Sequence, residues 1–389
     1  MFRSVLALVV LALPSWAQTF TVGPNGDFAE ISTALLSAQV VPGSTLVVEP
    51  GTYANFSVDK AVSIQAYGAF AAQVDVHDVP SFQLVGLKAS RLEVRNVSSK
   101  GLIADCLITG IGQQIDAYNS DVEVRDSANI VLQRTTVLGV SMCYPGGVDE
   151  ASNAVAIVNS SATLIDCNLA GGKSVDETNP ECEEHYPFVG AGLYVVEGST
   201  VDLIATSVEG QAAPFPTSNQ PAMWVLNGST VDARGTSANV LRGATAYAIL
   251  VDPLSSALIS GVTLEPSTPP PFTTWPAPAR AFLRVDGGFG LGATVTAHVH
   301  APAGTLTWTS FSGAPPGAPM ALLDGHLWLN ATAFAPLVPL VGAGLNTPAS
   351  LVVTLPLNPS LVGKTLVAQT ASYDGTTLAL LNPYFALLQ

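Results

Sequence analysis

Charged residues are scarce in this chain, and positively charged ones most of all. Only 11% of its 389 residues are charged, and 14 lysines and arginines stand against 29 aspartates and glutamates, which gives a formal net charge of −15. A strongly acidic surface repels nucleic-acid phosphates and anionic lipids. We therefore expect no nucleic-acid partner. A polyuronate would also be repelled unless Ca²⁺ bridged the two.

Long apolar runs are rare as well, and the longest lies at the start. Arg3 precedes an apolar run from Val5 to Leu13, and the small residues of Ser15-Trp-Ala17 follow it. This is the pattern of a secretory signal peptide over residues 1–17, and it is too short for a membrane span. No later run is long enough to span a membrane. The sequence thus predicts an exported protein, secreted or at the cell surface, that is not a transmembrane protein.

Cysteine is limited to four residues. Cys106 and Cys167 follow Asp in matching apolar contexts, so we expect strand positions and buried free thiols there. Cys143 and Cys182 lie in irregular stretches, where an oxidising compartment permits a disulfide between them. Spacing alone does not fix the connectivity. We predict the Cys143–Cys182 disulfide.

Turn-forming residues and short repeats are abundant instead. The chain has 34 glycines and 28 prolines, and the phrase Gly-Ser-Thr-Val-Asp occurs at 198–202 and again at 228–232. Between about 45 and 265, strands of about four residues with alternating apolar side chains are separated by Asn, Ser, Gly or Asp. One such unit cannot bury its apolar face alone, but stacked units can. The pattern favours a solenoid over an ordinary β-sandwich.

The residues just after the leader predict a lid for such a stack. Asp27 is placed to cap a short helix, with Glu30 completing a capping box. The apolar side of that helix would consist of Phe28, Ile31, Ala34, Leu35 and Ala38. An open first coil exposes backbone groups and apolar side chains, and an amphipathic helix can cover them.

A strand bracketed by two Pro-Gly turns follows the helix, from Pro42 to Tyr53. The order of helix, Pro-Gly, strand and Pro-Gly-Thr-Tyr resembles the entry segment of pectin-lyase-like proteins. This resemblance implies an all-β fold, a right-handed parallel β-helix over residues 18–264 with an N-terminal capping helix.

The composition and the strand pattern of the sequence change after residue 264. Residues 265–280 are rich in proline and predict a stiff linker. Residues 281–389 contain about seven alternating strands with Pro and Gly corners, which predicts a small antiparallel β-sandwich. This part resembles the C-terminal sandwich modules of exported bacterial proteins, notably those of planctomycetes. Such a module could cap the last coil, bind a wall glycan or carry a sorting signal.

The resemblance to pectin-lyase-like proteins directs attention to carbohydrate chemistry, because that group includes lyases, hydrolases, esterases and non-catalytic adhesins. The adjacent Asp pair of the hydrolases and the Gln-Asp-Thr-Leu context of the esterases are absent. A lyase needs a basic residue, and Arg95, Arg125 and Arg134 are the central ones that could share a face. Ordinary surface ion pairs are the alternative. We take Arg125 and Arg134 as candidate substrate-binding residues.

Acidic residues concentrate around Cys143 and Cys182. Hard cations take six to eight oxygen ligands, so this cluster is a candidate Ca²⁺ site, although its spacing matches no defined cation loop. A solvated acidic loop and an acid–base pair with His185 are the alternatives. The proposed Ca²⁺ ligands are Asp176, Glu181, Glu183 and Glu184, and the neighbouring candidate substrate-binding residues are His185 and Tyr186.

Aromatic residues fall in successive repeats, and Tyr194 and Trp224 occupy equivalent positions. We expect them to stack inside the solenoid, with an external sugar-binding platform as the alternative. His298 and His300 alternate on one strand face without an evident third metal ligand, so we expect a core or surface pair.

These observations predict a secreted β-helix protein that binds extracellular or cell-surface polysaccharide without a recognisable catalytic signature. One alternative is a polysaccharide lyase that acts on uronate-containing glycan with Ca²⁺, the one cofactor that the sequence suggests. The other is a structural surface protein or adhesin.

Overall fold

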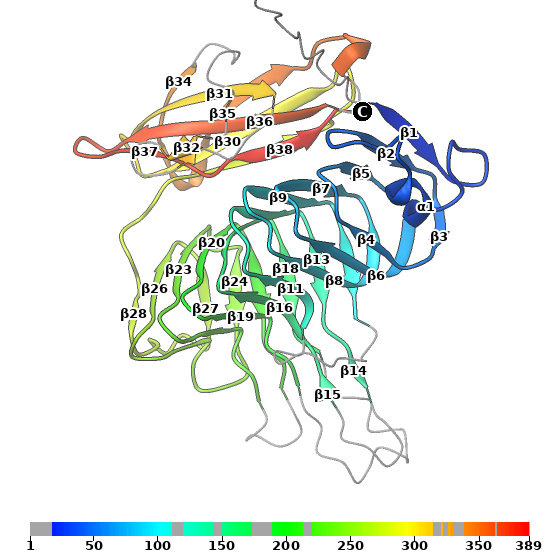
Figure 1. Cartoon of the computed structure of the whole chain (residues 1–389). Coiled ribbons are helices and arrows are strands. Elements are labelled where there is room, and N and C mark those ends of the chain that lie inside the picture. The colour runs from blue at the N-terminus through cyan, green and yellow to red at the C-terminus, as the bar shows by residue number, and fades with distance from the viewer. Residues whose placement is uncertain are drawn as a thin grey trace, which may run out of the picture.

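The computed structural model describes residues 18–110, 120–142, 150–172, 189–212, 219–313, 320–321, 326–327, 329, 338–361 and 364–388. The fold is all-β, with a right-handed parallel β-helix followed by a small antiparallel β-sandwich, as predicted (Figure 1). Within these ranges, no helix is both long and apolar enough to cross a membrane.

The N-terminal lid consists of strand β1 (Thr19–Val22) and helix α1 (Ile31–Leu36). The helix buries Ile31 and two further apolar residues against the first coils, as expected for a cap. The predicted capping box is wrong. The Asp27 carboxylate instead accepts hydrogen bonds from the backbone N–H and the hydroxyl of Thr21, at 2.7 and 2.9 Å, because its loop folds back onto β1. Glu30 is the N-cap residue, and its side chain makes no capping hydrogen bond.

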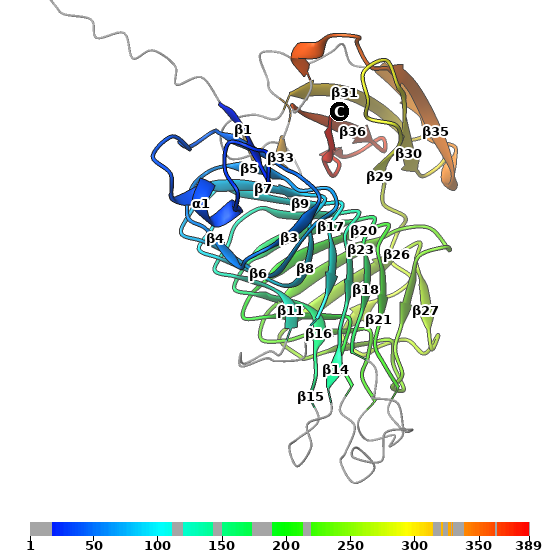
Figure 2. The same cartoon turned by 90° about the vertical axis from the view of Figure 1, so that its right-hand side faces the viewer.

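Each full coil contributes three short strands. Sheet A, with eleven parallel strands, takes one strand per coil, and neighbouring strands belong to successive coils (Figure 2). Its strands after β1 are β2 (Thr45–Val48), β5 (Ser63–Gln65), β7 (Ser81–Val85), β9 (Lys100–Ala104), β12 (Ile130–Gln133), β17 (Ser161–Ile165), β20 (Thr200–Ile204), β23 (Thr230–Arg234), β26 (Ser256–Ser260) and β28 (Thr273–Thr274).

Sheet B has fifteen strands and supplies the other two sides of the coil. The long strands β6 (Ala69–His77) and β8 (Lys88–Arg95) run through both sides, and β3 (Gly51–Tyr53) and β4 (Phe56–Val58) pair with β6. One side continues through β11 (Ser120–Arg125), β16 (Asn153–Val158), β19 (Leu193–Val196), β22 (Met223–Val225) and β25 (Ile249–Val251). The other continues through β10 (Leu107–Thr109), β13 (Thr136–Leu138), β18 (Asn168–Ala170), β21 (Ser207–Glu209), β24 (Val240–Arg242) and β27 (Thr263–Glu265). A separate two-stranded sheet pairs β14 (Ser141–Met142) with β15 (Glu150–Ala151).

A stack of buried serines holds one corner of the coils together. The backbone N–H of each serine except the last donates to the hydroxyl of the serine in the next coil, at 3.0 to 3.2 Å. Because buried polar groups need partners, this ladder satisfies a corner that the strand ladders leave open. Its members are Ser127, Ser160, Ser199, Ser229 and Ser255.

Cys106 and Cys167 are free and buried, which confirms the prediction of free thiols. They lie in the corner after β9 and β17, however, and not within strands. There the thiols donate to the carbonyls of Ala104 and Ile165, at 3.3 and 3.4 Å. Burial raises the pKa of both thiols to about 12. The predicted disulfide between Cys143 and Cys182 lies outside the described residues and stays a prediction.

The C-terminal sandwich has two main antiparallel sheets. One consists of β29 (Phe282–Gly287), β30 (Thr294–Ala301) and β35 (Gly344–Thr354). The other consists of β31 (Leu306–Gly313), β34 (Val338–Val341), β36 (Thr365–Tyr373), β37 (Leu378–Leu380) and β38 (Tyr384–Leu387). The short strands β32 (Met320–Ala321) and β33 (His326–Leu327) pair with each other, and a 3₁₀ turn spans Pro359–Leu361. Within the stretch 265–280, β28 pairs in parallel with β26, so part of the expected linker belongs to sheet A.

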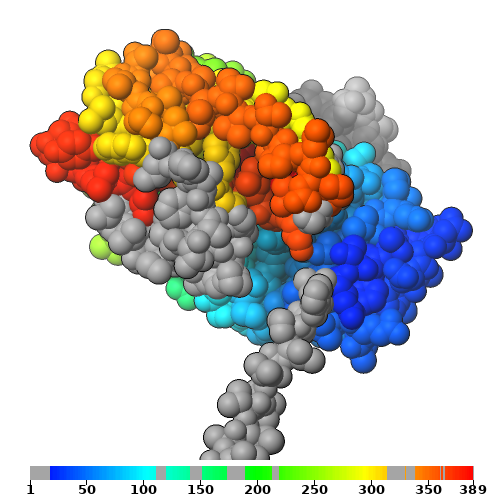
Figure 3. All heavy atoms as spheres, turned by 90° about the horizontal axis from the view of Figure 1, so that it is seen from above, coloured from blue at the N-terminus to red at the C-terminus, as the bar shows by residue number. Residues whose placement is uncertain are grey.

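The sandwich packs against the outer side of sheet A (Figures 1 and 3). A row of side chains points outward there from five successive coils, and all but Gln133 are apolar: Val85, Ala104, Gln133, Ile165 and Ile204. The apolar members form one cluster with Phe282, Tyr384 and Phe385 of the sandwich. The sandwich therefore covers the flank of the solenoid.

Candidate functional site

The outer side of sheet B carries a block of charges on the early coils. In β8, Leu92 and Val94 are fully buried in the core, so Arg91, Glu93 and Arg95 point outward by the alternation of a strand. The same alternation in β11 directs Glu123 and Arg125 outward.

Parallel register aligns these side chains across coils. Asp75, Glu93 and Glu123 face one another on β6, β8 and β11, and Arg95 lies opposite Arg125. Because neighbouring strands are roughly 4.8 Å apart, three carboxylates follow one another along the solenoid axis. We call the row that starts with Asp75, Glu93 and Glu123 the outer row.

Each glutamate of this row is paired with arginine. Arg95 Nε lies 3.0 Å from Glu93 Oε1, and Arg125 Nη2 lies 2.6 Å from Glu123 Oε1. Arg91 Nη2 is 3.8 Å from the other oxygen of Glu93. The Glu123 side chain is only 2% exposed, whereas that of Arg125 is 30% exposed. A buried carboxylate is stable as an anion only with such a partner, so the pair presents a guanidinium to the surface above a buried acid.

On the following coils, the outer row consists of apolar and aromatic residues. It continues through Ala156 on β16 to Tyr194 on β19 and Trp224 on β22. The rings of Tyr194 and Trp224 have centroids 6.4 Å apart at an interplanar angle of 51°. Trp224 Nε1 donates to Gln220 Oε1 at 3.0 Å, which fixes the indole. Burial raises the pKa of Tyr194.

The two aromatic residues therefore lie on the outside of the solenoid, and the expected internal stack is wrong. Their strand neighbours Leu193, Val195 and Met223 fill the core instead. Along the axis, the outer side of sheet B passes from charged residues, through small apolar ones, to a partly exposed aromatic pair. This sequence of surfaces suits an elongated ligand with both hydroxyl groups and apolar faces.

Arg134 does not share this surface with Arg125. It follows β12 at the corner of sheet A, where its Nε and Nη2 bind Asp105 at 2.6 and 2.8 Å. Its guanidinium also lies 5.1 Å from the ring centroid of Tyr384 and 5.4 Å from that of Phe289. Arg134 thus contacts the sandwich, and only Arg125 of the two candidate arginines lies in the outer-side charge block.

The other predicted site residues fall outside the described ranges. These are Asp176, Glu181, Glu183, Glu184, His185 and Tyr186, so the Ca²⁺ site and its neighbouring substrate contacts stay predictions. In the part of the chain that the structure describes, no group of three or more His, Cys, Asp or Glu side chains is arranged to hold a metal ion.

Of the two histidines for which a core or surface pair was expected, His300 is buried and His298 is partly exposed. His300 stacks on Phe282 with ring centroids 4.4 Å apart, and its Nδ1 lies 2.6 Å from the Leu345 carbonyl. Nδ1 of His298 lies 2.9 Å from the Ser350 hydroxyl, and its Nε2 lies 3.4 Å from Asp286.

Glu93 and Glu123 are site residues that the sequence reasoning missed. A signal for them exists, because Glu-Val-Arg occurs at 93–95 and again at 123–125. A charged triplet repeated at the spacing of one coil predicts charges stacked on one outer side.

No protein-family model matches this sequence, and no curated protein matches it. Among solved structures, the chain is similar to full-length tailspike protein 2 from Escherichia coli O157:H7 bacteriophage CAB120, with 13% identity over 85% of this chain and a TM-score of 0.23. It is also similar to the enzymatically active domain of tailspike protein 4 from bacteriophage CBA120, with 9% identity over 89% of this chain and a TM-score of 0.23. The matches span 52% and 64% of those two chains. Both likenesses are weak, so the fold and the site rest on the chain's own structure.

Proposed function

We propose that this protein binds extracellular or cell-surface polysaccharide along the outer row of sheet B. The observation that carries the proposal is the aromatic pair Tyr194 and Trp224, in register with the carboxylates Glu93 and Glu123. Aromatic rings pack on the apolar faces of sugars, while carboxylates and guanidinium groups hydrogen-bond sugar hydroxyls. A glycan chain lying along the solenoid axis would meet both kinds of group.

The charge of this surface favours a neutral glycan. Three carboxylates, those of Asp75, Glu93 and Glu123, are balanced by the guanidinium groups of Arg91, Arg95 and Arg125. The chain as a whole carries −15. A polyuronate would therefore gain little attraction at the row and be repelled by the rest of the surface.

Substitution of the indole tests the proposal. We expect Trp224→Ala to weaken binding to the recognised polysaccharide about tenfold, since loss of a stacking ring removes about 1.4 kcal/mol. Affinity electrophoresis against neutral and uronate polysaccharides, followed by calorimetry, measures the change. Trp308→Ala, which removes a partly exposed tryptophan on β31 of the sandwich, is the matched control. Equal binding by wild type and Trp224→Ala would contradict this location of the site.

Polysaccharide cleavage is the second candidate function. Glu93 and Glu123 lie on adjacent parallel strands, and strand backbones are roughly 4.8 Å apart, close to the carboxyl separation of about 5–5.5 Å in retaining glycosidases. The paired Arg95 and Arg125 likewise offer the basic group that a lyase needs. Binding is preferred because both carboxylates are already engaged by arginine, Glu93 by Arg95 and Glu123 by Arg125.

One assay separates these candidates. The mature chain is incubated with neutral and uronate polysaccharides, with and without Ca²⁺, and both new reducing ends and absorbance of unsaturated products are followed. Product formation that disappears in Glu123→Gln would assign an enzyme at the outer row. If polysaccharide binds but no product forms, the binding function stands; if nothing binds, a structural surface protein is favoured.

We also propose that the protein acts outside the cytoplasm, after removal of residues 1–17. The supporting observation is the short apolar leader followed by Ser15-Trp-Ala17. N-terminal sequencing of the exported chain should begin at Gln18. A cytoplasmic product that still begins at Met1 would contradict it.

A further inference from the structure

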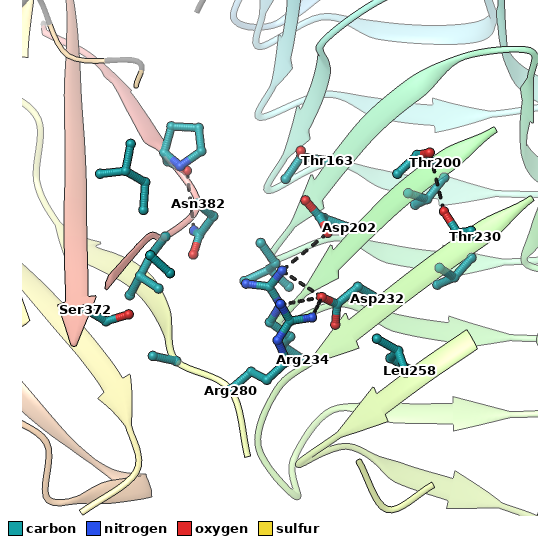
Figure 4. A pocket seen from close by; sticks show the side chains of 18 of the residues that line it. Thr163, Thr200, Asp202, Thr230, Asp232, Arg234, Leu258, Arg280, Ser372 and Asn382 are labelled. Carbon is teal, nitrogen blue, oxygen red and sulfur yellow. Dashed lines mark hydrogen bonds and ion pairs between the residues drawn. The ribbon is translucent and has the colours of Figure 1, made fainter. Parts of the chain in front are cut away.

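A groove of about 710 Å³ lies between sheet A and the sandwich (Figure 4). One wall consists of outward side chains from β17, β20, β23 and β26, and the other of residues 372–383 of the sandwich. Ligand sites for small molecules commonly measure about 300–1,000 Å³. The groove lies on sheet A and is therefore separate from the outer row, which lies on sheet B.

The polarity of the groove follows from one row of positions on successive coils. Leu102 and Val131, on the earlier coils, are buried beneath the sandwich. The same row continues as Thr163, Asp202 and Asp232, which line the groove. The next residue of the row is the apolar Leu258, so the polar part of the row within the groove consists of Thr163, Asp202 and Asp232.

A neighbouring row supplies hydroxyl groups. Ser161, Thr200, Thr230 and Ser256 are in register on four successive coils, and all four line the groove. Thr230 Oγ1 donates to Thr200 Oγ1 at 3.4 Å, as Figure 4 shows. Since strands are roughly 4.8 Å apart, hydroxyls recur along the axis at about the length of one sugar residue in an extended chain.

The charges in the groove are arranged around Asp232. Its Oδ2 accepts hydrogen bonds from Arg234, with Nη2 at 2.8 Å and Nε at 3.1 Å, and it also pairs with Arg280 from the segment before the sandwich (Figure 4). Two arginines therefore share one carboxylate, while Asp202 and Asp374 add negative charge to the lining. The described lining has no excess of positive charge to attract an anionic ligand.

We propose that this groove is a second carbohydrate site, which binds a neutral oligosaccharide by hydrogen bonds. Hydroxyls and carboxylates line both walls, and each can exchange hydrogen bonds with sugar hydroxyls. The amide of Asn382 also lines the groove, but it is bound to the backbone N–H and carbonyl of Leu283 and so serves to hold the wall in place. No aromatic side chain occurs among the lining residues that the structure describes. Recognition here depends on polar contacts, in contrast to the aromatic pair of the outer row.

Calorimetry on the full mature chain with cellohexaose, mannohexaose and laminarihexaose tests this site. Asp202→Asn should weaken binding of the recognised hexasaccharide about tenfold, because a hydrogen bond to a charged group is lost. Thr230→Val should weaken it about threefold. Thr52→Val, on the exposed side of β3 in an early coil, is the matched control and should leave the affinity unchanged. Melting temperatures of all variants confirm that they fold.

Trp224→Ala distinguishes the two sites. Retained hexasaccharide binding in Trp224→Ala, together with loss in Asp202→Asn and Thr230→Val, supports the groove. Loss in Trp224→Ala with full binding by both groove variants would overturn the groove site and leave the outer row intact. Absence of binding by all three hexasaccharides at millimolar concentration would also overturn it.

Discussion

Gln133 and Phe385 exchange two hydrogen bonds across the contact between the solenoid and the sandwich. Gln133 Nε2 donates to the Phe385 carbonyl at 2.6 Å, and the Phe385 N–H donates to Gln133 Oε1 at 2.7 Å. The neighbours of Gln133 in the outward row are the apolar Ala104 and Ile165. A buried amide surrounded by apolar groups is satisfied only in one position of the sandwich, so this pair selects how the two parts dock.

We expect Gln133→Ala to lower the free energy of unfolding by about 2–3 kcal/mol, because two buried hydrogen bonds are lost and a cavity forms. Urea denaturation followed by tryptophan fluorescence measures the change. Gln39→Ala, at an exposed position, should stay within about 0.5 kcal/mol of wild type. Coincident curves for Gln133→Ala and Gln39→Ala would show that the pair contributes little.

Asp166 should make stability depend on pH. It lies at the same contact, with Oδ1 3.2 Å from Arg284 Nε, and burial raises its pKa to about 6. A carboxyl whose pKa is higher in the folded state binds its proton more tightly there, so its contribution to stability falls as pH rises from about 4 to 6. Asp166→Asn does not titrate. Its melting temperature relative to wild type should therefore rise between pH 4 and 6 and level off above pH 7.

The exposed Asp59 supplies the control for this pH series, as Asp59→Asn. A melting-temperature difference between Asp166→Asn and wild type that stays constant from pH 4 to 7 would contradict the shifted pKa. So would an equal trend in Asp59→Asn.

The serine ladder should be sensitive to a single deletion. Ser199 is fully buried, accepts the Ser160 N–H at 3.1 Å and donates to the Ile157 carbonyl at 3.1 Å. We expect Ser199→Ala to cost about 1–3 kcal/mol, since the Ser160 N–H loses this acceptor. Ser57→Ala, exposed on β4, should be neutral. Hydrogen exchange of the Ser160 amide checks the mechanism, because unchanged protection in Ser199→Ala would exclude it.

The cysteines give a prediction in three steps. Native protein should react with no thiol reagent, because Cys106 and Cys167 are buried and their thiol pKa is about 12. Denaturation should release two reactive thiols, and denaturation with reductant should release four. Peptide mapping without reductant should recover Cys143 joined to Cys182. Labelling of either residue in the native protein would contradict the disulfide.

The solenoid was predictable because its repeats are explicit in the sequence. The two copies of Gly-Ser-Thr-Val-Asp, at 198–202 and 228–232, lead into β20 and β23, and their Thr-Val-Asp residues pair in register. The last residues of the two copies are Asp202 and Asp232, which line the groove. The repeat predicted the stacking of the coils, but these two aspartates were not predicted as site residues. Stacked repeats place identical side chains next to each other. A charged residue within such a repeat is therefore a candidate site residue.

The sides on which Tyr194 and Trp224 lie were less predictable. The strand Leu193–Val196 is apolar throughout, so alternation does not tell inside from outside. The face of sheet A on which the sandwich docks is easier to recognise in the sequence. Strand ends such as Leu164-Ile165 and Leu203-Ile204 place two apolar residues in succession, and a strand buried on both sides needs that pattern. The prediction of a capping box was wrong because the Asp27 carboxylate binds the N–H and hydroxyl of Thr21, six residues earlier, and not the helix N-terminus.

Strands β10, β13, β18 and β21 are neighbours in sheet B, and so are β11, β16, β19 and β22, so the connections between the two sets start and end at one corner. They join β10 to β11, β13 to β16, β18 to β19, and β21 to β22, and they differ in length from coil to coil. The strands on either side of each connection nevertheless stay paired with their neighbours. This corner therefore tolerates chain of variable length, and it is the place where foreign sequences could be grafted or existing ones shortened without disturbing the scaffold.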